Sequence, residues 1–189
     1  MKKISQNILA NLITFSRVGL IPWLIAGEIQ GNYFQSLMIM LIICFTDIID
    51  GKVARKGGGS NKIGKILDIT ADFTVVISIF LFWYIQRKIS FNIVFLILSS
   101  FISFIFLSFL KKEIVKNKMG QYTGAVCFMG IISILIGRTY FSLWIIEIKY
   151  VACIILSIFL ILSIIENILH MVNLVFSLHS IQRIRKQKF

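Results

Sequence analysis

Charged side chains are scarce in this sequence of 189 residues. They make up 15% of it, against about 25% in an ordinary soluble domain, whereas hydrophobic residues make up 58% and the mean hydropathy is +0.90. So few polar residues cannot cover a water-facing globule. The composition therefore excludes a disordered chain and a soluble globular domain, and it indicates that a lipid bilayer surrounds most of the chain.

Cysteines and acidic residues are also few. Cys44, Cys127 and Cys153 all lie inside apolar runs without metal-binding spacing, which predicts packing residues rather than disulfides or a zinc site. Eight acidic residues stand against 20 Lys and Arg, for a net charge of +12. Because the basic residues lie between apolar runs, this charge is typical of membrane-protein loops and predicts no nucleic-acid partner.

Six apolar runs divide the chain. A bilayer core of about 30 Å requires a helix of about 20 residues. Runs of this length lie near residues 8–27, 33–52, 66–86, 90–110, 121–141 and 150–172. The sequence therefore predicts an all-α, polytopic membrane protein with six transmembrane helices. These helices and their loops leave no room for a second domain, so residues 1–189 are predicted to form a single transmembrane domain.

The basic residues also predict the orientation. If the N-terminus is cytoplasmic, 15 of the 20 Lys and Arg residues fall on the cytoplasmic side and four on the other side. These four are Arg87, Lys88, Arg138 and Lys149, while Arg17 lies within the first run. Because positive residues concentrate in cytoplasmic loops, both termini are predicted to be cytoplasmic.

Half of the acidic residues lie within 26 positions, and they are Asp47, Asp50, Asp68 and Asp72. Spacings of three and four place each pair on one helix face, and the short connection brings the two helices side by side. Four carboxylates then converge just inside the membrane boundary, where they repel one another and require a cation. Oxygen ligands at this density suit Mg²⁺ or Mn²⁺ together with a substrate phosphate.

Two other interpretations of these acids stay open on spacing alone. The neighbouring basic residues Lys52, Arg55, Lys62 and Lys65 would neutralise them in an interfacial salt-bridge cluster. Alternatively, the acids would line the ion site of a transporter.

The small residues between the two acidic pairs favour a ligand site. A glycine within a helix costs about 1 kcal/mol relative to alanine, so Gly51 and Gly64 indicate a close backbone approach. Together with Ala54 they leave a smooth slot between the helices. Arg55 offers a planar fork for a diphosphate.

In order, these residues are Asp47-x2-Asp50-Gly51-x2-Ala54-Arg55-x8-Gly64-x3-Asp68-x3-Asp72. This segment, residues 47–72, resembles the full signature of the CDP-alcohol phosphotransferases. The resemblance implies that Asp47, Asp50 and Asp68 ligate two divalent ions, Mg²⁺ or Mn²⁺. It also implies that Asp72 is the general base and contacts a metal as well.

The resemblance extends to substrate contacts. It implies that Gly51, Ala54, Arg55 and Gly64 shape the nucleotide pocket and that Asn61 contacts the diphosphate. The segment Asn11-x2-Thr14-x2-Arg17 resembles the opening of bacterial phosphatidyltransferases, which helps to hold the CDP-lipid head group. Ser163-x2-Glu166 resembles a Ser-Gly-x-Glu element of bacterial phosphatidylglycerophosphate synthases, with Ile164 in place of the glycine.

The acceptor alcohol is less defined. Many phosphatidylglycerophosphate synthases and cardiolipin synthases end the signature with Asp-Pro-x-Ala-Asp-Lys, whereas this chain has neither that proline nor that lysine around Asp68 and Asp72. This difference disfavours glycerol 3-phosphate without excluding it. Lys111 and Lys112, predicted on the same side as the acids, would bind the phosphate of a phosphorylated acceptor, or they would only set topology and contact anionic lipids.

The sequence therefore predicts a multi-pass enzyme of the bacterial cytoplasmic membrane, in contact with membrane lipids and dimeric, as the family tends to be. It would move a phosphatidyl group from CDP-diacylglycerol to a small alcohol, with release of CMP, and glycerol 3-phosphate is the best single acceptor. Inositol phosphate, serine and an amino alcohol stay open as alternative acceptors. The reversed pair of a CDP-amino alcohol with diacylglycerol stays open as an alternative pair of substrates. A divalent-cation transporter and a pseudoenzyme are the alternatives from other classes, although Asp72 disfavours the pseudoenzyme.

Overall fold

The structure is a computed structural model. It describes the backbone of residues 2–56, 62–111, 118–141 and 145–186, and within these ranges it describes all side chains except those of residues 2–13, 48, 50–56, 62–65, 111, 118–121, 145, 175 and 177–186.

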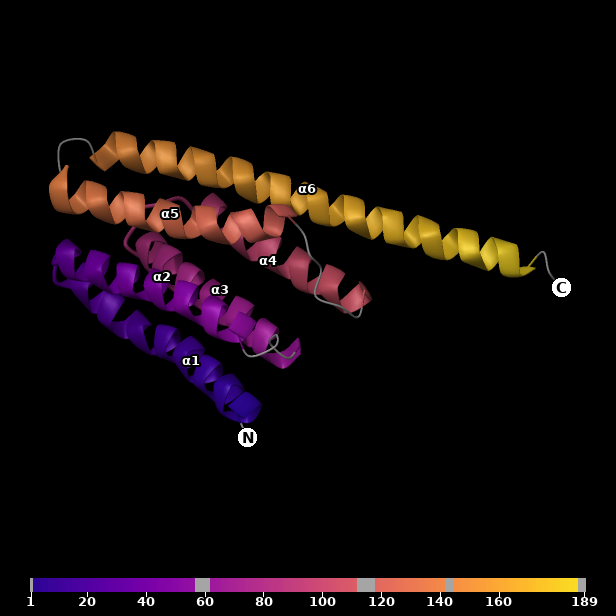
Figure 1. Ribbon diagram of the computed structural model, residues 1–189. Coiled ribbons are helices and arrows are strands. Elements are labelled where there is room, and N and C mark those ends of the chain that lie inside the picture. Colours follow the sequence, from indigo (N-terminus) through magenta and orange to yellow (C-terminus); the bar gives the residue numbers. More distant parts are fainter. Residues whose placement is uncertain (1, 57–61, 112–117, 142–144, 187–189) are drawn as a thin grey trace.

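The described chain forms six helices, drawn in Figure 1. They are α1 (Lys2–Ile29), α2 (Tyr33–Lys56), α3 (Lys62–Ile85), α4 (Phe91–Lys111), α5 (Lys118–Tyr140) and α6 (Ile145–Lys186). The prediction of an all-helical fold is confirmed for these residues. The beginning of α1 and the end of α6 lie toward the same end of the molecule (Figure 1), as an even number of helices requires. Which side of a membrane this end faces stays a prediction.

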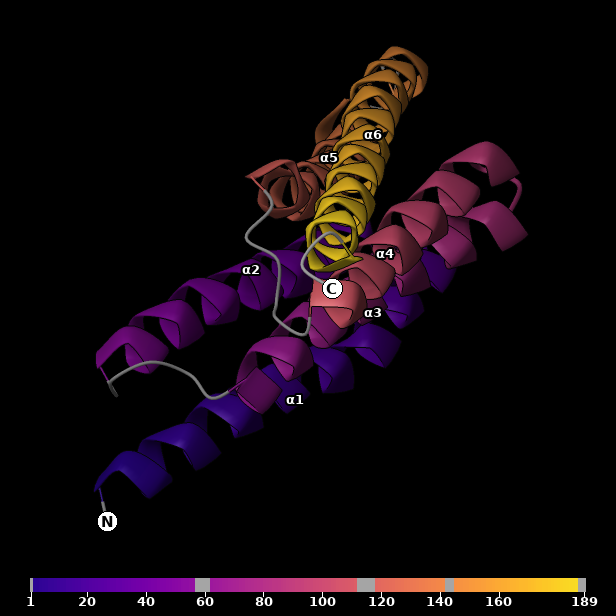
Figure 2. The same cartoon turned by 90° about the vertical axis from the view of Figure 1, so that its right-hand side faces the viewer.

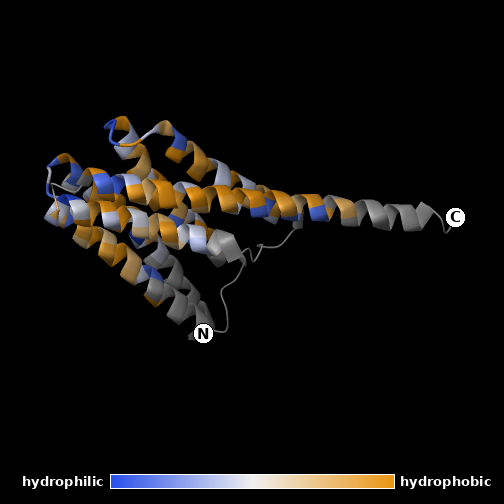
Figure 3. Cartoon of the chain, turned by 90° about the horizontal axis from the view of Figure 1, so that it is seen from above, coloured by the Kyte–Doolittle hydropathy of each residue, from blue (hydrophilic) through white to orange (hydrophobic). Residues whose placement is uncertain are grey.

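Among the residues that the structure describes in full, four helices contain stretches that are long and apolar enough to cross a membrane. These stretches are Ile66–Ile85, Phe91–Leu110, Tyr122–Tyr140 and Ile146–Leu174, whereas α2 has a shorter apolar stretch, Tyr33–Asp47. Large apolar side chains lie exposed along the helices. In Figure 3 most of the coloured ribbon has the orange of hydrophobic residues. Such extended apolar surface fits a lipid environment. Six spans remain a prediction.

Helix α6 is longer than expected. It has 42 residues, whereas the apolar run predicted a helix near residues 150–172. Between Ile145 and Lys186 the sequence contains neither glycine nor proline, so nothing in it breaks the helix where the apolar run ends. Figures 1 and 2 show α6 lying along α4 and α5 and extending beyond them.

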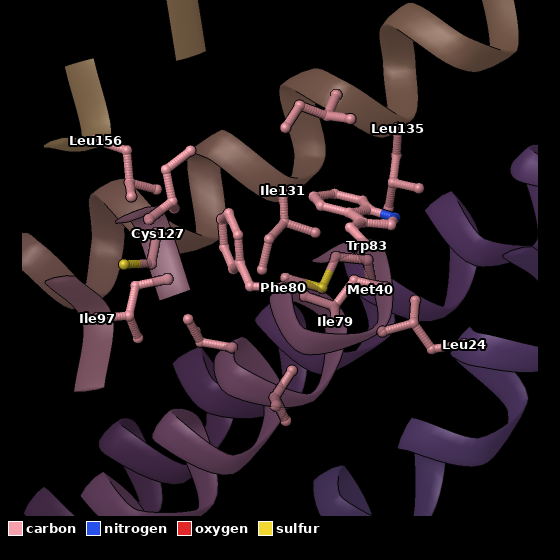
Figure 4. Close-up of a cluster of buried hydrophobic side chains, with 14 of the residues drawn as sticks. Leu24, Met40, Ile79, Phe80, Trp83, Ile97, Cys127, Ile131, Leu135 and Leu156 are labelled. Carbon is pink, nitrogen blue, oxygen red and sulfur yellow. The ribbon is translucent and has the colours of Figure 1, made fainter. Parts of the chain in front are cut away.

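The core is built around α3. Trp83, Phe80 and Ile79 of this helix are buried in a hydrophobic cluster to which all six helices contribute side chains. Figure 4 shows the cluster, in which α1 contributes Leu24, α2 Met40, α4 Ile97, α5 Cys127, Ile131 and Leu135, and α6 Leu156. The three cysteines are free and lie in this core or against it, which confirms that they are packing residues.

The α1–α2 connection is tight. Gly31 ends α1 with a φ of 73°, a left-handed conformation that costs glycine little. Asn32 then caps α2, because its Oδ1 accepts a hydrogen bond from the Gln35 amide at 3.2 Å. This turn lays α2 antiparallel to α1 and brings Asp47 beside the middle of α1.

Candidate active site

Arg17 of α1 lies at the centre of a cluster of acidic residues. Its Nη1 donates to Asp47 Oδ1 of α2 at 3.0 Å, and its Nη2 donates to Asp68 Oδ1 of α3 at 2.6 Å. Nη1 also donates to Asp72 of α3. One guanidinium thus joins three carboxylates from two other helices.

The three carboxylates are close enough to share a metal ion. One oxygen from each of Asp47, Asp68 and Asp72 lies within 4.8 Å of the others. The Arg17 side chain is fully buried, whereas the three aspartate side chains are 44%, 43% and 28% exposed, in that order. The arginine therefore holds the acids from inside the bundle, and their outer sides are open to a cation and its ligands. Hard carboxylate oxygens are the donors that Mg²⁺ and Mn²⁺ favour.

Local helix geometry explains how these side chains meet. Asp68 and Asp72 are separated by one turn of α3 and therefore share a face. Both α2 and α3 pack on α1, which places Arg17 between them. Next to Asp72, the ring of Phe73 stacks on Phe101 of α4, with centroids 3.6 Å apart. This stacking fixes the acid-bearing part of α3 against its neighbour.

Several predicted site residues have undescribed side chains. The backbone places Asn11 in α1, Asp50, Gly51, Ala54 and Arg55 in α2, Gly64 in α3 and Lys111 at the end of α4. Asn61 and Lys112 lie outside the described residues. Thr14 is described and buried, one turn before Arg17 on α1. The roles of all these residues stay predictions.

Sequence reasoning missed the pairing of Arg17 with the acids. The resemblance assigns this residue to a lipid head group, and the salt-bridge alternative pairs the acids with basic residues near them in sequence. Among the described side chains it is Arg17 that neutralises them, whereas the side chains of Lys52, Arg55, Lys62 and Lys65 lie outside the described part. A lone cation in an apolar helix is itself a signal for a buried carboxylate partner.

Polar residues also join α4 to α6. Ser100 Oγ donates to Ser163 Oγ at 3.2 Å, and Asn167 Nδ2 donates to Ser103 Oγ at 2.9 Å. Ser163, singled out by its resemblance to a family element, is thus part of an interhelical contact. Hydrogen bonds of this kind hold apolar helices together in a membrane.

Comparisons with known proteins agree with the signature. The family model described as CDP-alcohol phosphatidyltransferase matches residues 7–179. A curated relative from Aquifex aeolicus (strain VF5), CDP-diacylglycerol--glycerol-3-phosphate 3-phosphatidyltransferase, is 40% identical over 62 residues. That match spans 33% of this chain and 35% of the relative, so the chain matches about a third of the relative's length. On the family match over most of its length, the chain belongs to the CDP-alcohol phosphatidyltransferase family of membrane transferases.

Proposed function

We propose that the protein transfers a phosphatidyl group from CDP-diacylglycerol to glycerol 3-phosphate and releases CMP. The observation that carries this proposal is the cluster of three outward-facing carboxylates on α2 and α3, within 4.8 Å of one another. These residues belong to the signature segment 47–72. The activity for which the A. aeolicus relative is named supports glycerol 3-phosphate as the acceptor.

In this proposal Asp47, Asp50 and Asp68 hold two divalent ions, Mg²⁺ or Mn²⁺. When bound, such ions stabilise the negative charge on the phosphoryl oxygens. Asp72 accepts the proton of the acceptor hydroxyl on a carboxylate oxygen. The acceptor oxygen then bonds to the phosphorus that carries the lipid, and the bond from that phosphorus to the CMP oxygen breaks.

The remaining predicted residues have binding roles in the proposal. The small residues of α2 and α3 leave space for the nucleotide, and Arg55 and Asn61 contact the diphosphate. Asn11, Thr14 and Arg17 of α1 help to hold the CDP-lipid head group. Lys111 and Lys112 bind the phosphate of the acceptor.

We further propose that residues 1–189 act as one six-span domain with both termini in the cytoplasm of a bacterial cell, and that the protein works as a homodimer. This orientation gives the carboxylates access to water-soluble glycerol 3-phosphate and lets CMP leave into the cytosol. The lipid substrate and product stay in the surrounding leaflet.

The test is release of CMP by purified protein in detergent with CDP-diacylglycerol and Mg²⁺. Glycerol 3-phosphate, inositol phosphate, inositol, serine and ethanolamine are supplied in separate reactions. We expect release with glycerol 3-phosphate, and we expect Asp72→Asn to lower the rate by about 10²–10⁴-fold because a general base is lost. Glu147→Gln, which removes a negative charge at an exposed position of α6, is the matched control and keeps the rate.

Each outcome bears on a different part of the proposal. CMP release with a different acceptor would show that glycerol 3-phosphate is not the substrate, while the proposed type of reaction would stand. CMP release at an unchanged rate by the Asp72→Asn variant would show that Asp72 is not the general base. If no acceptor led to CMP release, the proposed direction of transfer would be contradicted. The reversed pair of CDP-ethanolamine with diacylglycerol would then be assayed.

A further inference from the structure

A second cluster of charged residues lies at the C-terminal end of α1. Glu28 has a fully buried side chain, and its Oε2 accepts a hydrogen bond from Trp83 Nε1 of α3 at 2.9 Å. The same oxygen pairs with Arg138 of α5 and lies 3.5 Å from Lys88 Nζ. Glu28 follows Arg17 by 11 residues, so about 16 Å of helix separates the two clusters.

A cavity of about 320 Å³ opens beside this cluster. Its lining combines four apolar residues, Trp83, Ile89, Ile134 and Ile146, with four basic ones, Arg87, Lys88, Arg138 and Lys149. Its volume lies within the range of about 300–1,000 Å³ that is usual for ligand pockets. A site with one apolar wall and several cations suits a ligand that is itself anionic at one end and apolar at the other.

The cavity has an excess of positive charge. Glu28 pairs with Lys88 and Arg138, whereas Arg87 and Lys149 form no ion pair with any side chain that the structure describes. Burial and the charge of Arg138 lower the pKa of the Lys88 ammonium from its ordinary value of 10.5. One carboxylate thus does not balance the charge of four cations. An anion bound in the cavity would reduce this excess of positive charge.

The backbone at Arg87 supports a ligand role. Arg87 adopts a φ of 55°, a left-handed conformation that costs a residue with a Cβ about 1 kcal/mol or more. The comparable turn after α1 has Gly31 in this conformation. A side chain retained where glycine would be less strained indicates a use for that side chain.

The cavity also lies at the level expected for lipid head groups. It is bounded by the ends of three apolar stretches, since Ile66–Ile85 ends shortly before Arg87, Tyr122–Tyr140 contains Arg138 near its end, and Ile146–Leu174 begins shortly before Lys149. Where apolar helices end, phospholipid phosphates meet the protein. We propose that this cavity binds the phosphate of an anionic phospholipid, with Arg87 and Lys149 contacting the phosphate and the apolar wall contacting the acyl chain.

Binding of phosphatidylglycerol to the purified full-length protein, followed by native mass spectrometry, tests this site. Arg87→Gly relieves the strained turn while it removes a cation, and Lys149→Gln removes the second one at a half-buried position. We expect about fivefold weaker binding for each charge removed, and therefore about 25-fold in the double variant. Thermal unfolding of the variants checks that the fold is kept.

Three controls separate the alternatives. Lys3→Gln removes one positive charge near the opposite end of α1 and is expected to leave binding unchanged. Phosphatidylcholine is expected to bind more weakly than phosphatidylglycerol, and inorganic phosphate at equal concentration is expected not to compete. Unchanged phosphatidylglycerol binding in the double variant would overturn the site, and full competition by inorganic phosphate would show a free-anion site instead of a lipid site.

Discussion

The two buried charged clusters have opposite arrangements. At one end of the bundle, a fully buried arginine, Arg17, is surrounded by three partly exposed aspartates. At the other end, a fully buried glutamate, Glu28, is paired with Arg138 and Lys88, whose side chains are 13% and 28% exposed. Both centres lie on α1, and both contact α3, at Asp72 and at Trp83.

This difference relates burial to ligand charge. In each cluster the single buried charge holds several charges of the opposite sign, and these surrounding charges are the ones that reach the surface. The sign of the accessible charge then agrees with the ligand that we propose for each site, a divalent cation at Asp47, Asp68 and Asp72 and an anion in the cavity beside Glu28. A buried ion pair contributes little net stability, so these clusters are better explained as supports for binding sites.

The largest effect on stability is expected from Glu28→Gln. Removing this carboxylate leaves Arg138 and Lys88 without their buried partner, which costs about 3 kcal/mol and corresponds to a fall in melting temperature of about 10 °C. Thermal unfolding in detergent, followed by circular dichroism, measures it. Glu147→Gln at an exposed position is the control. Equal melting temperatures for the two variants would show that Glu28 does not stabilise this end of the bundle.

A smaller effect is expected from Arg17→Gln, and it would distinguish the two clusters. If the accessible acids bind a divalent cation, the Arg17 charge opposes that binding, so its removal should raise the affinity for Mn²⁺ by about tenfold, or 1.4 kcal/mol. Titration calorimetry of the purified variant measures this affinity. Arg17→Lys keeps the charge and should leave the affinity nearly unchanged. Weaker Mn²⁺ binding by Arg17→Gln would mean that the arginine only positions the acids.

The smallest effect concerns Lys88 and pH. The pKa of Lys88 is lower in the folded protein than its ordinary value of 10.5. At pH values between these two pKa values, the unfolded chain therefore binds more protons than the folded one. Lys88 consequently makes folding more favourable as the pH rises through this range. Lys88→Met removes this contribution. Unfolding free energies at about pH 8 and about pH 10 should therefore rise less with pH in the variant than in the wild type. Identical pH dependence would show that Lys88 retains its ordinary pKa.

The helices could be predicted from the sequence because each of them contains an apolar run, although among the described residues four helices hold a stretch long and apolar enough to cross a membrane. Three predicted runs lie inside an observed helix, and each of the other three extends one residue beyond its helix at one end. The end of α6 could not be predicted from hydropathy, since a helix continues past an apolar run when no residue breaks it. Helix periodicity predicts that Asp68 and Asp72 share a face. Asp47 meets them because α2 and α3 each pack on α1, rather than through the direct packing of these two helices that the sequence predicts.

The charged pairings were beyond sequence reasoning for a physical reason. Arg138 and Glu28 are 110 positions apart, and whether they meet depends on how α5 and α1 each pack against α3. The sequence predicts only that Arg138 lies on the non-cytoplasmic side, whereas in the structure its side chain is mostly buried against Glu28. Arg17 likewise meets the acids only because α1 is rotated to face both α2 and α3. Rotation about a helix axis is a property of packing, and no local pattern specifies it.

The unequal apolar lengths of the helices have a mechanical consequence. The apolar stretches of α3, α4 and α5 have 20, 20 and 19 residues, whereas that of α6 has 29. At 1.5 Å per residue these correspond to about 30 Å and about 43 Å, against a hydrocarbon core of about 30 Å. The first three match the bilayer, while α6 must tilt or thicken the lipid around it. Since α6 packs along α4 and α5, a change in bilayer thickness acts as a torque on the bundle through this one helix.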